Sequence, residues 1–371
     1  LHRRSKEEPV EEFCWRRHCM GNTGSPAVAV ATIKLLAEEH KEAFPLAAEV
    51  ILKSSLIDDL LDSHPDAETA IRAAEELEAL LAKAKMSLRK FFSNDERVLA
   101  TIPMAQREPK VDVITIGQGS QEPSSLETVA RANVKALGVI YHPSSDTFRF
   151  EIADPFPGEP VTKRIILVTY SRLFDPLGLI APVTIIPRMI FQHCWTKNYQ
   201  WDTHLDQDDQ ALWLKWLETT MKHLAEIHVP RVLMDAIPVK TQLFCFTDGS
   251  NAAFGAVVYL RATYEDGSVS VRLVSAKSRL APLKRATIPR VELLGVVLGA
   301  KLTNQIKKAI KADEVTYLSD SQTVLWWLSL TNRQLQLYVG NRVRQTNLLT
   351  GDAAWKFVPG EENPADHPTR G

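Results

Sequence analysis

The pattern of apolar and polar positions predicts a mostly helical first hundred residues. Apolar side chains recur at helical spacing over 27–40, after Gly24-Ser25-Pro26, and over 65–86, a long stretch of Ala, Glu and Leu. Between them, Asp58 and Asp59 stand among apolar residues. Such a pair fits a turn between two short buried strands, and an isolated Asp-Asp pair is ordinarily a turn or a helix cap.

A polar stretch separates this helical part from the middle of the chain. Residues 107–125 are rich in Gly, Pro, Ser and Gln, which predicts a linker or exposed loop and a domain boundary. Alternating stretches at 137–141 and 147–152 then predict the two strands of a hairpin.

Proline and glycine punctuate residues 170–182, which predicts a buried elbow. Helical patterns follow, one up to about residue 201 and one over 206–227. The tryptophans of this region are interpreted as core side chains rather than as base-stacking groups. They are Trp195, Trp201, Trp213 and Trp216.

The last third of the chain changes to short strands followed by alternating helices and strands. In chain order the pattern predicts strands at 242–247, 255–260 and 269–276, a helix at 289–309, a strand at 315–318, helices from Ser321 and from Leu335, and a strand at 354–358. The first three strands make an antiparallel meander. The whole order predicts a mixed sheet with helices on its faces.

Composition limits the class of protein. At roughly 150 residues per domain, 371 residues suggest two or three domains. Hydrophobic residues make up 45% and charged residues 24%, an ordinary globular composition. The 44 Lys and Arg residues are balanced by 45 Asp and Glu residues, so the chain lacks the strong basic excess of many nucleic-acid binders. Any polyanion would therefore be held by local basic patches.

Cysteine usage and the termini indicate an intracellular setting. Cys14, Cys19, Cys194 and Cys245 form no CxxC pair, which argues against a disulfide framework or a zinc knuckle. A charged N-terminus and the lack of a long apolar run predict a soluble cytoplasmic protein with no membrane partner. Because the sequence starts without Met and ends directly after a motif, we expect a fragment of a longer polyprotein or of a disrupted gene copy.

Four acidic residues are candidates for chemistry. Asp248 and Asp320 each follow an apolar strand, Glu292 lies on a helix that is apolar nearly all round, and Asp366 lies where the last strand gives way to a Pro-started helix. Each has a plain alternative when taken singly. Asp248 suits a turn, Asp320 suits a helix N-cap, and Glu292 and Asp366 suit the first turn of a helix.

Taken together, these carboxylates would converge if the strands are neighbours in the sheet. Convergent carboxylates repel one another unless cations neutralise them. Oxygen-only ligands select Mg²⁺ or Mn²⁺, and two such ions about 4 Å apart support phosphodiester cleavage.

The motifs around these residues resemble the ribonuclease H domain of retroelement polyproteins. They are Thr247-Asp248-Gly249-Ser250, Arg290-Val291-Glu292-Leu293, Leu318-Ser319-Asp320-Ser321 and Asn363-Pro364-Ala365-Asp366. Residues 170–182 with Trp201-Asp202 look like the connector of the BEL/Pao group of LTR retrotransposons, the Pao retrotransposon peptidase family. Residues 20–26, 56–59 and 87–94 are similar to the later part of that group's reverse transcriptase.

This resemblance implies a multidomain protein of α/β and α+β class. It implies a partial reverse transcriptase (palm end and thumb) at 1–106, a linker and connector at 107–240, and a ribonuclease H-like domain with a mixed five-stranded sheet at 241–371. It also implies a virus-like particle as the setting if the element is active. Self-association and binding of other polyprotein products stay open.

The resemblance further implies the activity and its site. Asp248, Glu292, Asp320 and Asp366 would bind Mg²⁺ or Mn²⁺, and the substrate would be an RNA/DNA hybrid whose RNA strand is recognised by its 2′-hydroxyl groups. Five basic residues are candidates for contacts with the backbone phosphates, with a solvated loop as the equal alternative. They are Lys277, Arg279, Lys284, Arg285 and Arg290.

The chain departs from the family's polymerase pattern. Leu56 replaces the aromatic residue that normally begins the Asp-Asp motif, and the segment with the first polymerase Asp would precede Leu1. Asp58 and Asp59 are therefore interpreted as a vestigial polymerase metal site, and we expect no DNA polymerisation.

Two rival functions remain. An aspartic peptidase would resemble Asp-Thr-Gly or Asp-Ser-Gly, whereas this chain has Asp248-Gly249-Ser250. The other rival is a catalytically silent relic or an adopted protein that only binds nucleic acid or protein.

Overall fold

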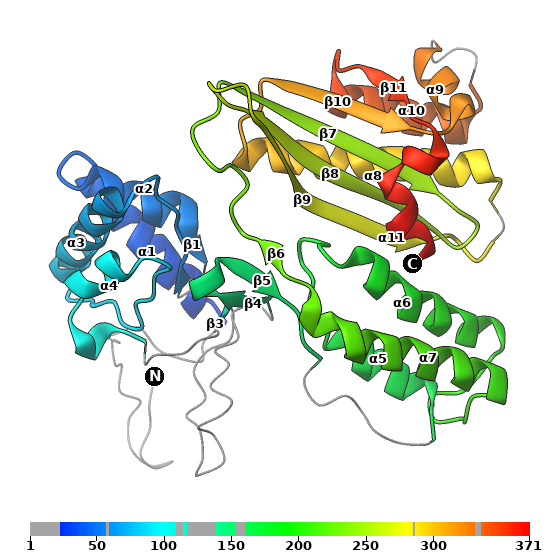
Figure 1. Cartoon of the computed structure of the whole chain (residues 1–371), viewed down its shortest axis with the longest axis horizontal. Coiled ribbons are helices and arrows are strands. Elements are labelled where there is room, and N and C mark those ends of the chain that lie inside the picture. The colour runs from blue at the N-terminus through cyan, green and yellow to red at the C-terminus, as the bar shows by residue number, and fades with distance from the viewer. Residues whose placement is uncertain are drawn as a thin grey trace, which may run out of the picture. The chain divides into compact units, whose positions relative to one another are not determined.

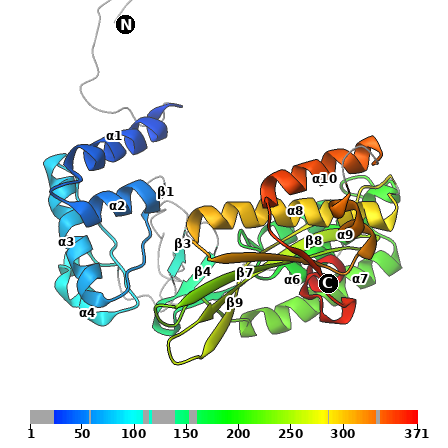
Figure 2. The ribbon, with the colours of Figure 1, turned by 90° about the horizontal axis from the view of Figure 1, so that it is seen from above.

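The structure is a computed structural model, and it describes residues 23–56, 59–108, 114–116, 139–152, 160–284, 286–330 and 335–371. The chain divides into two units, Leu1–Val111 and Asp112–Gly371, which are described separately (Figures 1 and 2). Cys14, Cys19 and most of the predicted linker lie outside the described residues. None of the helices described is long and apolar enough to cross a membrane.

Helices dominate the first unit, as the apolar spacing predicts. They are α1 (Ser25–His40), α2 (Pro45–Ser54), α3 (Ala67–Lys83) and α4 (Glu96–Thr101). The predicted helices at 27–40 and 65–86 are confirmed as α1 and α3. Helix α3 begins where the Asp66 side chain accepts a hydrogen bond from the Thr69 amide at 2.7 Å. Its Leu77 and Leu80 pack with Ile51 of α2, so the apolar stripe of the sequence forms this unit's core.

Strands β1 (Ser55–Leu56) and β2 (Asp59–Leu60) pair antiparallel. The two predicted short strands are therefore present, but Asp59 lies in β2 and not on a turn between them. Asp58 itself lies outside the described residues, and Asp59 is exposed, so the expectation that both strands are buried is wrong for β2.

The second unit begins with a small antiparallel sheet. Its strands are β3 (Ile114–Ile116), β4 (Val139–His142), β5 (Thr147–Arg149) and β6 (Val229–Pro230). The predicted hairpin is confirmed as β4 and β5, with a shorter second strand. Arg231, directly after β6, forms an ion pair of 2.6 Å with Asp146 in the hairpin turn.

A layer of three helices follows, α5 (Lys163–Ser171), α6 (Ala181–Thr196) and α7 (Gln207–His223). Trp213 and Trp216 are buried in the core of this layer, as predicted. Trp195 and Trp201 are 47% and 38% exposed, so their interpretation as buried core is wrong. Their rings instead pack against the ammonium group of Lys163, which lies 3.6 Å from the centre of the Trp195 ring.

The predicted mixed five-stranded sheet is confirmed. Its strands are β7 (Lys240–Gly249), β8 (Ala253–Thr263), β9 (Val269–Leu280), β10 (Glu314–Ser319) and β11 (Trp355–Phe357), in the spatial order β11-β10-β7-β8-β9. Strands β7, β8 and β9 form the antiparallel meander, while β10 runs parallel to both β7 and β11.

Helices cover both faces of this sheet (Figure 2). Because side chains alternate along a strand, Val258 and Leu260 of β8 pack against Leu302 and Ile306 of α8 (Ile288–Ala309), on one face. Val257 points to the other face, where it packs with Ala181 of α6. Helices α9 (Gln322–Ser329) and α10 (Leu337–Thr350) complete the α8 side, and the short α11 (His367–Arg370) lies on the α6 side.

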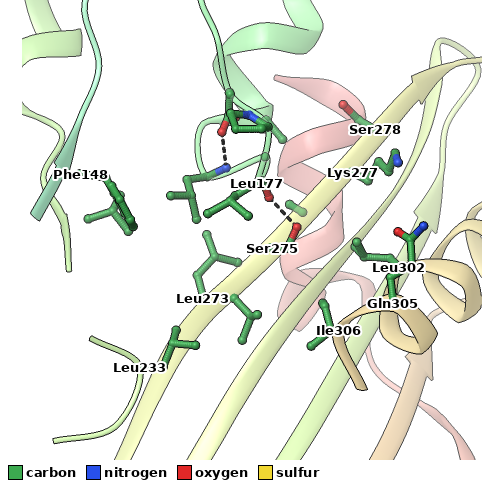
Figure 3. Close-up of a pocket in the computed structure, with 18 of the residues that line it drawn as sticks. Phe148, Leu177, Leu233, Leu273, Ser275, Lys277, Ser278, Leu302, Gln305 and Ile306 are labelled. Carbon is green, nitrogen blue, oxygen red and sulfur yellow. Dashed lines mark hydrogen bonds between the residues drawn. The ribbon is translucent and has the colours of Figure 1, made fainter. Parts of the chain in front are cut away.

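The predicted elbow at 170–182 docks on the outer edge of β9 (Figure 3). The Leu177 carbonyl accepts hydrogen bonds from the Ala276 amide at 2.8 Å and from the Ser275 hydroxyl at 2.6 Å. The Asp175 carboxylate accepts from the backbone amides of Leu179 and Ile180 and so holds the turn. Part of the last edge strand is thereby paired, which protects it from edge-to-edge association.

Gly178 is expected to be indispensable to this docking. Its φ is +73°, and a Cβ atom there would lie 1.8 Å from the Ala276 carbonyl oxygen. Gly267 has a similar φ of +80° with nothing within 4 Å of a Cβ, so it is a matched control. The left-handed backbone costs either alanine variant roughly 1–2 kcal/mol, and the clash costs Gly178→Ala a further ~1–3 kcal/mol. Equal losses in urea unfolding of the two variants would contradict this expectation.

Candidate functional site

Three predicted site residues meet at one edge of the sheet. Because β7 and β10 are parallel, with Thr247 opposite Ser319, Asp248 and Asp320 lie beside each other where the strands end. Asp366 joins them from the C-terminal turn, and each of the three offers a carboxylate oxygen within 4.8 Å of the others. Asp248 is the last residue but one of β7 rather than a residue beyond the strand, so its interpretation as a simple turn residue is wrong.

Glu292 is brought to this edge by unusually close packing of α8 on β7. A Cβ atom at Gly249 would lie 2.5 Å from the Glu292 backbone nitrogen, and one at Gly295 would lie 2.4 Å from the Asp248 carbonyl oxygen. Only glycine allows the two backbones to approach this closely. Glu292 is not one of the three residues within 4.8 Å, but its carboxylate accepts a hydrogen bond of 2.5 Å from Ser321, the neighbour of Asp320.

Asp320 is not the N-cap of α9. Ser321 takes that role, because its hydroxyl accepts the hydrogen bond of the Val324 amide at 3.2 Å. Among the described residues, no partner donates a hydrogen bond to the buried Oδ1 atom of Asp320. A buried carboxylate oxygen without a donor is costly, so this atom points to a ligand such as a cation.

Asp366 closes a 3₁₀ turn (Pro364–Asp366) that leads directly into α11. Asn363 fixes this turn through its side chain. The Nδ2 atom donates to the Thr247 carbonyl at 3.1 Å, and the Oδ1 atom accepts from the Ala365 backbone amide. Arg370 forms an ion pair of 2.9 Å with Asp366. The predicted Pro-started helix is thus a 3₁₀ turn and a four-residue helix.

Burial and mutual repulsion work against ionisation of this group. Burial raises the pKa of Asp320, and the negative charge of Asp248 raises it further. Burial also raises the pKa of Glu292, opposed by the Ser321 hydrogen bond and reinforced by Asp320 and Asp248. Burial and Asp248 raise the pKa of Asp366, while Arg370 lowers it. A divalent cation would remove this repulsion.

The predicted phosphate-binding residues that the structure describes lie on β9, just beyond it, and at the start of α8. Lys277 and Arg279 are exposed at alternate positions of β9, Lys284 is exposed beyond it, and Arg285 lies outside the described residues. Arg290 is partly buried at the start of α8, where its guanidinium lies 5.2 Å from the centre of the Tyr338 ring.

Lys277 also lines a cavity of about 620 Å³ between the elbow, β9 and the end of α8 (Figure 3). Its walls are mostly apolar and include Leu177, Leu273 and Ile306. None of the four candidate carboxylates lines it, so this cavity is separate from the site.

Sequence reasoning missed the polar residues that hold the carboxylates in place. They are Ser321, Asn363, Thr369 and Arg370. Ser321 directly follows a candidate Asp, and Asn363 and Thr369 stand three residues to either side of Asp366. Their proximity to the acidic residues was the available signal.

The fold and site define the class of protein. A mixed sheet in this order, with helices on both faces and acidic residues at the ends of two parallel strands, is the RNase H-like fold. Residues 162–321 match the family described as Pao retrotransposon-like RNaseH-like domain. That segment is similar to this family of retrotransposon domains, and it includes Asp248, Glu292 and Asp320.

Solved structures similar to this chain share little sequence with it. The N-terminal RNase H domain of a Mycobacterium tuberculosis protein is 19% identical, covering 35% of this chain and 94% of that one, with a TM-score of 0.27. LC11-RNase H1 in complex with RNA/DNA hybrid is 12% identical, with a TM-score of 0.26. The match covers 34% of this chain and 91% of that one. Foamy viral protease-reverse transcriptase in complex with RNA/DNA hybrid is 14% identical, with a TM-score of 0.22. The match covers 40% of this chain and 24% of that one. No protein with a curated description matches the chain.

Neutralising Asp320 is expected to stabilise the metal-free protein at neutral pH. A carboxyl whose pKa is raised by folding stabilises the fold fully below its unfolded pKa of about 4, and this stability is lost as the pH rises through the folded value. In chelator at pH 7, Asp320→Asn should therefore melt on the order of a few °C above wild type. Thermal melts at lower pH should show this difference shrinking.

The control for this melt series is Glu265→Gln, which changes an exposed carboxylate between β8 and β9, beyond the end of β8 that lies away from Asp248. The repulsion assigned to Asp320 would be contradicted if Asp320→Asn raised the melting temperature as much at pH 3.5 as at pH 7. It would also be contradicted if the control variant raised the melting temperature by the same amount.

Proposed function

We propose that this chain is a retrotransposon-derived ribonuclease H-type endonuclease that cuts the RNA strand of RNA/DNA hybrids by two-metal hydrolysis. The single observation that carries the proposal is the convergence of Asp248, Asp320 and Asp366 within 4.8 Å. Glu292, held beside them by Ser321, is proposed as the fourth ligand.

The residues at the sheet edge fit a divalent cation. They supply carboxylate oxygens without His or Cys, the donor set of Mg²⁺ or Mn²⁺, and the Asp320 Oδ1 atom needs a partner. Bound there, the metal ions would activate a water molecule and stabilise the leaving oxygen of the phosphodiester.

The contribution of the chain itself is to hold the ligands in place before substrate arrives. Asp248 is nine-tenths or more buried at the end of a central strand, and its neighbour Thr247 donates a hydrogen bond to the Leu318 carbonyl of β10 at 3.1 Å. Rigid strands and the packed α8 keep the carboxylates close despite their repulsion. Arg370 offsets part of this charge at Asp366. Such preorganisation is what metal-assisted hydrolysis requires of a protein.

An RNA/DNA hybrid is the proposed substrate class because residues 162–321 match a retrotransposon-like RNaseH-like family. The motif resemblance described above extends this proposal to Asp366. Lys277, Arg279, Lys284, Arg285 and Arg290 are proposed to follow the backbone phosphates. The same origin supports our proposal that residues 1–106 are a remnant of a reverse transcriptase, with Asp58 and Asp59 as its vestigial metal site, and that 107–240 are its connector.

Nuclease activity can be tested with a labelled RNA/DNA hybrid and Mg²⁺ or Mn²⁺. We expect the purified chain to cut only the RNA strand. Because metal ligation contributes several kcal/mol to the transition state, Asp248→Asn, Asp320→Asn and Asp366→Asn should each lower the rate on the order of 10³-fold or more. Glu265→Gln should leave it unchanged. RNA that stays intact at every metal concentration would sink the proposal in favour of the silent relic, and cleavage of a protein substrate would favour the peptidase.

The basic residues predict a salt-dependent contribution to hybrid binding. A contact between Lys284 and a phosphate releases about one counterion, so Lys284→Gln should weaken binding for all sequences and reduce the slope of log affinity against log salt by about 1. Lys307 is also exposed but lies in the last turn of α8, whereas Lys284 precedes the first turn, so Lys307→Gln is the matched control. Fluorescence anisotropy of a labelled hybrid measures the affinity and its salt dependence for both variants. Identical slopes for the two variants would show that Lys284 does not contact the hybrid.

A further inference from the structure

Thr369 is a buried hydroxyl at the candidate metal site that the motifs did not single out. It lies on α11, three residues after Asp366, and is 0% exposed. Its Oγ1 atom donates a hydrogen bond to the Asp248 Oδ2 atom. The acceptor is a carboxylate in a buried setting, where charge-assisted hydrogen bonds are roughly twice as strong as neutral ones.

Two further contacts fix Thr369 itself. The Ser250 hydroxyl, two residues after Asp248, donates to the Thr369 carbonyl at 3.0 Å. On the other side, the Thr369 methyl group lies so close to Gly255 that a Cβ there would be 3.0 Å from it. Thr369 is therefore held at both its backbone and its side chain against β7 and β8.

The helix that carries Thr369 is in turn packed on α6. Ala365, just before α11, is buried with Ala181 of α6 and with Val257 and Ala276 of the sheet. At the chain end, a Cβ on Gly371 would lie 2.5 Å from the Ile186 side chain. The helical layer that precedes the sheet in the sequence thus sets the position of the last turn of the chain.

We propose that Thr369 is a positioning residue that orients the Asp248 carboxylate for metal binding. This inference rests on the proposed function. One short segment would then do two things at the site: Asp366 supplies a ligand, and Thr369 three residues later holds the ligand supplied by β7. With Oδ2 engaged by the hydroxyl, the Oδ1 atom of Asp248 would serve as the oxygen that binds the cation.

The competing role for this hydroxyl is purely local. Its oxygen also lies 3.0 Å from the Asp366 carbonyl and 3.3 Å from the Ala365 carbonyl, as a threonine of any helical turn does. A hydroxyl has one proton, so it serves either the carboxylate or a carbonyl at a given moment. Removing a merely local bond would lower stability without changing metal affinity.

The test compares Thr369→Val, which removes the hydroxyl at nearly constant shape, with Thr369→Ser, which keeps it. Thr350→Val is the matched control, since that buried hydroxyl donates to the Thr346 carbonyl at 3.1 Å within α10, a purely local bond. Mn²⁺ affinity is measured by titration calorimetry on the full chain without nucleic acid. Thermal melts in chelator report stability, and hybrid cleavage against Mg²⁺ concentration reports the half-saturating metal.

We expect Thr369→Val to weaken Mn²⁺ affinity about 10–100-fold, the usual cost of losing a hydrogen-bond partner of a metal ligand, and to raise the half-saturating Mg²⁺ equally. Thr369→Ser should stay within a few-fold of wild type in metal affinity, and Thr350→Val should match wild type. If the valine variant fails to fold, Thr369→Ala removes the same hydroxyl without the branched side chain.

Normal Mn²⁺ affinity in Thr369→Val would overturn the positioning role while leaving hybrid cleavage, and so the proposed function, intact. Equal losses in the Ser and Val variants would also overturn it, because the hydroxyl would then not be the cause. If the wild-type chain neither binds Mn²⁺ nor cuts the hybrid, the proposed function itself is wrong. This result differs from the two outcomes that would overturn only the role of Thr369.

Discussion

The contact between α8 and β7 is the constraint on which the rest of the site depends. Glycines at 249, 295 and 299 let the helix backbone lie directly on the strand, where a Cβ at Gly299 would be 2.6 Å from Thr247 Cγ2. Larger side chains would push the helix outward by a methyl group or more, and Glu292 would move away from Asp248 with it. Close packing of the core therefore sets the geometry of the acidic edge.

Repulsion among the carboxylates at this end of the sheet lowers the stability that the packing of α8 on β7 provides. Asp248, Asp320 and Asp366 are held within 4.8 Å although each carries a negative charge when ionised, and burial removes the water that would screen them. Hydrogen bonds from Thr369 and the ion pair with Arg370 offset only part of this repulsion. An arrangement that costs stability without a cation is typical of a site shaped for function rather than for folding.

The helical layer and the sheet depend on each other more than their separation in the sequence suggests. The elbow at Leu177 pairs with the edge of β9, and α6 packs against the turn that carries Asp366 and Thr369. The family match covers residues 162–321 and so includes both the helices and most of the sheet. An acidic residue after the end of that match is thus placed partly by helices near its beginning.

Local pattern was sufficient to predict the order and type of nearly every element in the last third, because alternation and helical spacing record which face of each element is buried. The same reasoning failed at Trp195 and Trp201, since an apolar ring can pack on a buried ammonium as well as in a core. It also could not show which carboxylates meet. Each is a plausible turn or cap by itself, and only the parallel pairing of β7 with β10 and the docking of α11 bring Asp248, Asp320 and Asp366 together. By itself the sequence determined the elements and the list of acidic candidates. Which of them meet, and which hydroxyls hold them, was decided by tertiary structure, because the hydroxyl contacts join residues 29 to 121 positions apart and no local period records them.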